Sequence, residues 1–125
     1  MQLVRVRDGA VVAADLRVAG TFTTQLLGLM FRAGLRSGEG LWLHSCNAIH
    51  MMFMRFSIDV LFLRSEPRPQ PGTEGELLKV CSNVRPWIGM AWCMGASTTV
   101  ELAAGTASRM GLRAGDLLCV RENTP

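Results

Sequence analysis

Three side chains that can carry a charge or a proton, His50, Arg55 and Asp59, lie close together in an otherwise apolar part of the sequence. Burying a charge among apolar groups is costly unless the charge is paired, so Asp59 should meet Arg55, a backbone N–H group or another basic residue. Two interpretations stay open. The group either fixes a bend between strands, or forms a pocket in which Arg55 binds a polar or anionic ligand while His50 exchanges a proton near neutral pH.

A second set of candidates, His44, Cys46, His50 and Asp59, could hold a metal ion or form a thiol-based active site. On a strand, His44 and Cys46 share one face, and His50 shares that face if no bulge intervenes. Structural zinc sites usually contain tighter pairs such as C-x₂-C or H-x₃-H, and the sequence has neither. It also lacks nucleophile-elbow, C-x-x-C redox, phosphate-loop and dinucleotide-binding motifs. We therefore predict a protein that is not an enzyme and holds no metal or cofactor, with a metal-dependent or thiol hydrolase as the alternative.

The length of 125 residues and the hydrophobic content of 49% predict a single domain, residues 1–125, with one sizeable core. The net charge of +3 comes from arginines scattered singly along the chain, unlike the clustered pattern of a nucleic-acid interface. The sequence shows neither a leader pattern nor an uncharged stretch of about 20 residues, the length of a membrane span. We therefore expect a cytoplasmic monomer or homodimer with reduced cysteines, and neither nucleic acid nor a membrane as partner.

The order of apolar and turn-forming residues predicts an α+β, predominantly β domain, small and barrel-like or sandwich-like. Asp8-Gly9 is a strong turn pair that indicates an N-terminal β-hairpin, and apolar residues at helical spacing predict one short helix near residues 23–34. The segment Pro86 to Trp92 is apolar but irregular, so we expect a buried or half-buried loop, with Trp87 at a pocket rim or partner surface. Short strands are expected at residues 41–43, 47–54, 56–63, 77–81, 98–102 and 117–120, with a polar loop at 65–76 and one or two helical turns at 107–111.

The central block from Ile49 to Leu63 carries the most specific pattern in the chain. Ile49-His50 followed by FMRFSIDVLFL resembles the central signature of the family called domain of unknown function 192, and the pieces GLMFR, PW, VELAAG and GLRAGD flank it in that family's order. Ser57, Arg64 and Ala103 stand where the family favours Pro, Asp and Pro, and Arg64 reverses a charge near a strand end. The resemblance to these uncharacterised bacterial and archaeal proteins implies a compact β-rich domain. It transfers no catalytic residue, because none is established for the family.

These residues together predict a non-enzymatic binding module for a small polar or anionic ligand or for a protein partner. Its ligand-binding residues would be His50, Arg55, Asp59 and Trp87, arranged around one cleft. The sequence contains a distinctive set of polar residues without a complete catalytic set, and this contrast is the basis of the prediction.

Overall fold

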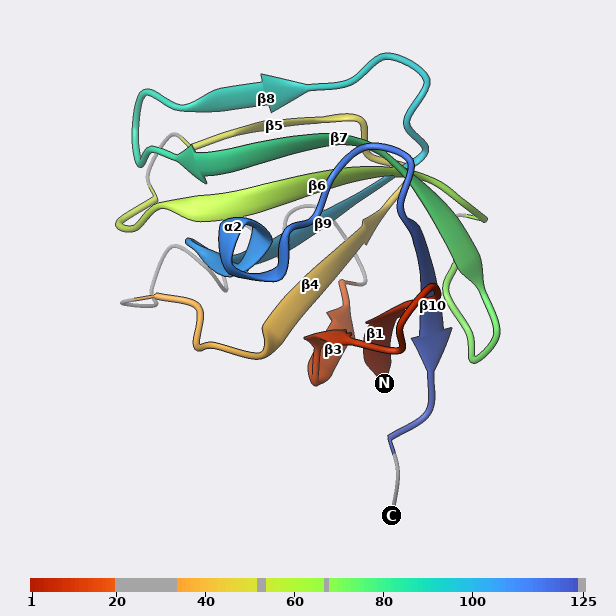
Figure 1. Ribbon diagram of the computed structural model, residues 1–125. Coiled ribbons are helices and arrows are strands. Elements are labelled where there is room, and N and C mark those ends of the chain that lie inside the picture. The colour runs from red at the N-terminus through yellow and green to blue at the C-terminus, as the bar shows by residue number, and fades with distance from the viewer. Residues whose placement is uncertain (20–33, 52–53, 67, 124–125) are drawn as a thin grey trace.

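The chain forms one large mixed sheet, a small second sheet and a short helix in the part that the computed structural model describes, residues 1–19, 34–51, 54–66 and 68–123 (Figure 1). The predicted α+β, predominantly β class is confirmed. The helix predicted near residues 23–34 lies outside the described residues, except for Gly34. No helix in the described ranges is long and apolar enough to cross a membrane. The elements are β1 (Gln2–Arg5), β2 (Val11–Ala13), β3 (Asp15–Val18), β4 (Glu39–His44), β5 (Ala48–His50), β6 (Ile58–Arg64), β7 (Glu74–Val84), β8 (Met90–Trp92), β9 (Thr98–Ala103), α2 (Thr106–Met110) and β10 (Leu117–Arg121).

The large sheet has eight strands in the order β2-β1-β10-β7-β6-β9-β4-β3, which leaves β2 and β3 at its edges. Strand β3 runs parallel to β4, and the other neighbours are antiparallel. The N–H of Leu16 in β3 donates to the carbonyl of Met1, 2.8 Å away, so the edge strand β3 comes close to the start of β1. The sheet nevertheless does not close, and of the two predicted shapes the closed barrel is not formed. The predicted N-terminal hairpin is confirmed as β1 and β2.

Strand β6 lies in the middle of the large sheet and is covered on both faces. Every residue from Ile58 to Leu63 is 0% exposed, which explains why this strand, apart from Asp59, is apolar throughout rather than alternating. Leu61 and Leu63 belong to a first core, which also contains Trp42, Ala107 of α2 and the buried residues of β10. Val60 and Phe62 belong to a second core on the opposite face of the sheet.

The two-stranded sheet of β5 and β8 forms an outer layer over the second core. Ile49 of β5 and Ala91 of β8 are paired, and both are buried in that core. This second layer gives the molecule the predicted sandwich-like character on one side. The expectation of a buried or half-buried loop at Pro86 to Trp92 is wrong, because Met90–Trp92 is a strand and only one of its faces meets the core.

Candidate functional site

Asp59 is fully buried in β6 and binds two backbone N–H groups from separate elements. Its Oδ1 accepts the N–H of Asn83 in β7 at 2.8 Å, and its Oδ2 accepts the N–H of Ala107 in α2 at 2.9 Å. The first of these groups belongs to a bulge, since the register of β6 and β7 shifts between Ile58 and Val60 and Asn83 has a φ of 52°. The second lies in the first turn of a helix, where N–H groups have no partner within the helix.

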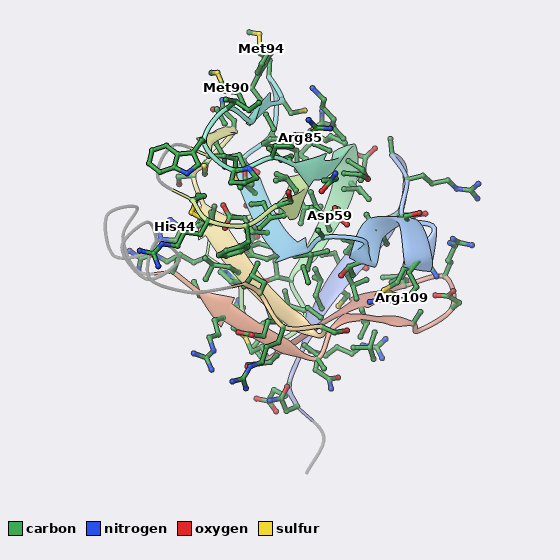
Figure 2. The ribbon with its side chains drawn as sticks, turned by 90° about the vertical axis from the view of Figure 1, so that its left-hand side faces the viewer. His44, Asp59, Arg85, Met90, Met94 and Arg109 are labelled. Carbon is green, nitrogen blue, oxygen red and sulfur yellow. The ribbon has the colours of Figure 1, made fainter. Side chains whose placement is uncertain are left out.

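This arrangement gives Asp59 a structural role, in which one carboxylate joins β6, β7 and α2. Hydrogen bonds to a carboxylate are shorter and stronger than those between neutral groups, which suits a junction of three elements. Of the partners expected from the sequence for Asp59, a backbone N–H group is the one that the structure provides, twice. Figure 2 shows Asp59 inside the molecule, away from the labelled methionines at its end.

The other predicted ligand-binding residues lie in different surroundings from Asp59. Arg55 and Trp87 are exposed, and His50 is paired with Met90 through the β5–β8 ladder, although its side chain lies outside the described part of the structure. The backbone carbonyl of Met51 accepts the N–H of Trp87 at 2.7 Å and so joins the segment after β5 to the turn before β8. A ligand-binding role for His50, Arg55, Asp59 and Trp87 stays a prediction. Two surface hollows, of about 410 and 330 Å³, are lined by other residues, namely residues 14, 15, 17 and 36–39 for the first, and residues 66 and 70–74 for the second.

The alternative set of site residues, predicted for a metal or thiol hydrolase, has few of the features of such a site. Its members are His44, Cys46, His50 and Asp59. His44 and Cys46 are half-buried, and the Cys46 thiol donates to the carbonyl of Ala48 at 3.1 Å. Among the residues that the structure describes, no group of three or more His, Cys, Asp or Glu side chains could hold a metal ion. The hydrolase alternative stays a prediction without a described cluster behind it.

Glu101 is a buried acid that the sequence reasoning missed. It lies in β9 between Leu41 of β4 and Val60 of β6, is 7% exposed, and has an Oε2 atom without a hydrogen-bond partner in the described structure. Burial raises the pKa of this carboxyl group to about 7, so it can hold a proton near neutral pH. The alternation around it, Val100-Glu101-Leu102, is typical of a strand with one face in water, and the buried position was therefore not expected.

The most exposed large apolar side chains described lie on β8 and the two turns that flank it, and we call this region the β8 surface. Its five side chains are between 57% and 90% exposed: Trp87, Ile88, Met90, Trp92 and Met94. Within β8 the alternation turns Met90 and Trp92 outward, because Ala91 between them points into the second core. Figure 2 shows Met90 and Met94 at one extremity of the molecule.

The turn before β8 has a tight backbone that fixes how Trp87 and Ile88 are presented. The N–H of Gly89 donates to the carbonyl of Arg85 at 3.0 Å, and a Cβ atom on Gly89 would lie only 2.3 Å from that same oxygen. Only glycine fits this position without movement of the chain. After the strand, Lys79 of β7 donates to the carbonyl of Trp92 at 2.9 Å and lies 5.5 Å from the centre of its ring.

Comparisons with known proteins support the fold and the family but supply no activity. The model of the family DUF192, described as "Uncharacterized ACR", matches residues 3–120 and confirms the resemblance seen in the sequence. A proposed transcription regulator from Sinorhizobium meliloti 1021 has a similar structure, with a TM-score of 0.70, 21% identity, and coverage of 94% of this chain and 88% of that one. A protein of unknown function from Novosphingobium aromaticivorans DSM 12444 has a TM-score of 0.69 and 19% identity, with coverage of 94% and 83%. No curated protein matches the sequence.

Proposed function

We propose that this chain, which belongs to the DUF192 family of uncharacterised proteins, is a non-enzymatic binding module that docks on the surface of a lipid bilayer through the β8 surface. The proposal keeps the binding role predicted from the sequence. It moves the docking site from the cleft around His50, Arg55 and Asp59 to the neighbouring turn–strand–turn that carries Trp87. It also replaces the expectation that no membrane takes part, which rested on the lack of a spanning segment.

The observation that carries the proposal is the exposure of five large apolar side chains in one short stretch of chain. The largest contiguous apolar patch on a typical monomer covers about 300–600 Å² and is often functional, whereas single exposed apolar residues are normal. Full burial of one such side chain is worth about 1.5–3 kcal/mol, so leaving five of them in water forgoes a large part of a domain's stability. The exposure is therefore best explained by a partner that covers these side chains.

The shape and composition of the β8 surface favour a bilayer over another protein. Met90 and Met94 project from an extremity of the molecule (Figure 2), and all five side chains are more than half exposed, so a protein partner would need a matching cavity. A second copy of the chain would place the cations Lys79 and Arg85 against themselves with no acid between residues 77 and 100 to pair with them. Tryptophan, here at positions 87 and 92, is enriched where an apolar phase meets water, because its ring is apolar and its N–H is polar.

Co-sedimentation of the full chain with vesicles tests this function. We expect the protein to sediment with vesicles made of equal parts phosphatidylcholine and phosphatidylglycerol. Replacing Ile88 and Met94 by serine should release most of it, because these two side chains are the most exposed of the set and contribute little to the core. A matched control replaces Val6 and Val11, exposed apolar residues near the N-terminal hairpin, by serine and should leave binding unchanged.

Two results would overturn the proposal. Either the wild-type protein stays in the supernatant with these vesicles, or the Ile88 and Met94 double variant sediments as well as wild type. If the β8 surface binds a protein partner and not lipid, the wild-type protein will stay in the supernatant.

A further inference from the structure

We infer that the bilayer recognised by the β8 surface is an anionic one, and that Arg55, Lys79 and Arg85 contact its headgroup phosphates. This inference rests on the proposed function and names the class of lipid. It gives Arg55 the kind of anionic ligand that the sequence predicted for it, supplied by a surface instead of a cleft.

In the two stretches of chain that contain β5 and β8, all the Asp, Glu, Lys and Arg residues present are cationic. The two stretches of chain that build this end of the molecule, residues 40–58 and 77–100, contain Arg55, Lys79 and Arg85 and no Asp or Glu. Arg55, Lys79 and Arg85 are all exposed. A surface that is apolar at its centre and cationic around it complements a membrane whose apolar interior lies beneath anionic headgroups.

Elsewhere in the described structure, several arginines have acidic partners. Ion pairs join Arg5 to Asp8, Arg7 to Asp116, Arg17 to Asp15 and Arg64 to Glu76, at distances of 2.9 to 3.7 Å. The exposed acids of the described chain are carried by the N-terminal strands, the segment between β6 and β7 with the start of β7, and the C-terminal residues. In Figure 1 these elements lie away from β8.

The backbone places two of the cations beside the apolar side chains. Arg85 begins the tight turn that carries Trp87 and Ile88, because its carbonyl accepts the N–H of Gly89. Arg55 follows Met54, whose N–H donates to the same carbonyl of Met51 that binds the N–H of Trp87. The third cation, Lys79 of β7, donates to the backbone carbonyl of Trp92 at the end of β8.

Apolar insertion and electrostatic attraction are each weak alone, which explains why the apolar side chains and the cations occur together at the β8 surface. A single apolar anchor gives only marginal, reversible membrane binding, and firm attachment takes a second signal such as a basic patch. Each cation near an anionic surface strengthens binding about fivefold, and this contribution falls off over the Debye length. The apolar side chains would supply affinity for any bilayer, and the cations would select an anionic one.

Binding constants for two vesicle compositions separate the inference from the function on which it rests. We expect the wild-type protein to bind vesicles of equal parts phosphatidylcholine and phosphatidylglycerol at least tenfold more tightly than pure phosphatidylcholine. Raising NaCl from about 0.1 M to about 1 M, which shortens the Debye length from about 10 Å to about 3 Å, should remove most of that preference. The double variant Arg55→Gln with Arg85→Gln should bind the anionic vesicles about 25-fold more weakly.

The matched control removes the same charge from the other side of the molecule. Arg109 in α2 and Arg113 after it are exposed, and Figure 2 shows Arg109 far from Met90 and Met94, so Arg109→Gln with Arg113→Gln should leave affinity unchanged. Equal loss in both double variants would overturn the assignment to Arg55 and Arg85. Equal, salt-independent binding to both vesicles would overturn the anionic preference and leave the docking function standing. Binding to neither vesicle would overturn both.

Discussion

The two faces of the large sheet differ in how they treat apolar and charged groups. On the face that carries the first core, Asp59 binds two N–H groups, and Arg5 binds both oxygens of Asp8 together with the carbonyl of Met110 at 2.6 Å. On the face that carries the second core, Glu101 has an oxygen without a described partner, and the outer layer exposes five large apolar side chains. Both faces belong to the same strands, so the difference between them lies in their side chains and in what packs on each face, not in the strands themselves.

The difference shows where the sequence has been optimised for stability and where it has not. A protein with a margin of about 5–15 kcal/mol can carry an unsatisfied acid and an exposed apolar surface only if the rest of the fold compensates. Deviations of this kind gather at functional sites more than elsewhere. The contrast therefore supports the choice of the β8 side as the functional side.

The largest expected effect comes from a substitution on the face of the first core, where both oxygens of Asp59 have hydrogen-bond partners. Asp59→Ala leaves the buried N–H of Ala107 and the partly buried N–H of Asn83 without an acceptor, which should lower the free energy of unfolding by about 3 kcal/mol. Asp59→Asn keeps one carbonyl oxygen and should cost clearly less. Urea unfolding of both variants measures this, and a loss below about 1 kcal/mol for Asp59→Ala would contradict the structural role of the carboxylate.

The next effect concerns Glu101, which differs from Asp59 in having a carboxyl oxygen without a described hydrogen-bond partner. The pKa of Glu101 is raised from 4.5 to about 7, so the unfolded chain gives up its proton between these pH values while the folded chain retains it. Stability should therefore fall by about 3 kcal/mol as the pH rises from 4.5 to 7 and change no further above that range. Glu101→Gln should remove this component when urea unfolding is followed against pH. Parallel curves for wild type and variant would show that the carboxyl group titrates normally.

A smaller effect concerns the turn that presents Trp87 and Ile88. Gly89→Ala places a Cβ atom 2.3 Å from the carbonyl oxygen of Arg85 and should cost about 2 kcal/mol as the turn moves. Gly34→Ala is the matched control, because no atom lies within 4 Å of its added Cβ. Thermal unfolding of the two variants compares them directly, and equal melting temperatures would mean that the turn is looser than described.

The smallest effect separates docking from folding. Ile88→Ser and Met94→Ser remove apolar groups that bury little in the folded protein, so each should change the free energy of unfolding by at most about 0.5 kcal/mol. The same variants are expected to lose most vesicle binding. Strong destabilisation by either one would mean that these side chains support the fold, and their exposure would then need another explanation.

The sequence predicted the parts of this structure that follow from local pattern. The apolar residues of β6, the turn at Asp8-Gly9 and the burial of Asp59 were expected, and a backbone N–H was one of the three kinds of partner left open for Asp59. These features depend on residues close in sequence or on the general cost of burying charge. Trp87 was expected at a pocket rim or partner surface, but the rest of the β8 surface was missed, because a three-residue strand has too few positions to reveal its alternation. Its small inward residue, Ala91, and the lack of acids from residue 77 to 100 were the available signals.

Glu101 was missed for a different reason. An acid between two apolar strand residues normally points to water, and only packing over that face of the sheet reverses this. The strands beside Glu101, β4 and β6, and the second core on that face come from segments far apart in the sequence, so no local pattern could predict the burial. The same long-range packing decides which apolar side chains stay exposed.

Tryptophan fluorescence in the presence of vesicles tests the central claim most directly. Trp42 is 1% exposed and should keep its emission, whereas Trp87 and Trp92 are more than half exposed and would enter the bilayer interface. The account predicts a blue shift when vesicles of equal parts phosphatidylcholine and phosphatidylglycerol are added, together with quenching by lipids brominated near the headgroup. Emission that stays unchanged with lipid in excess would contradict docking through the β8 surface.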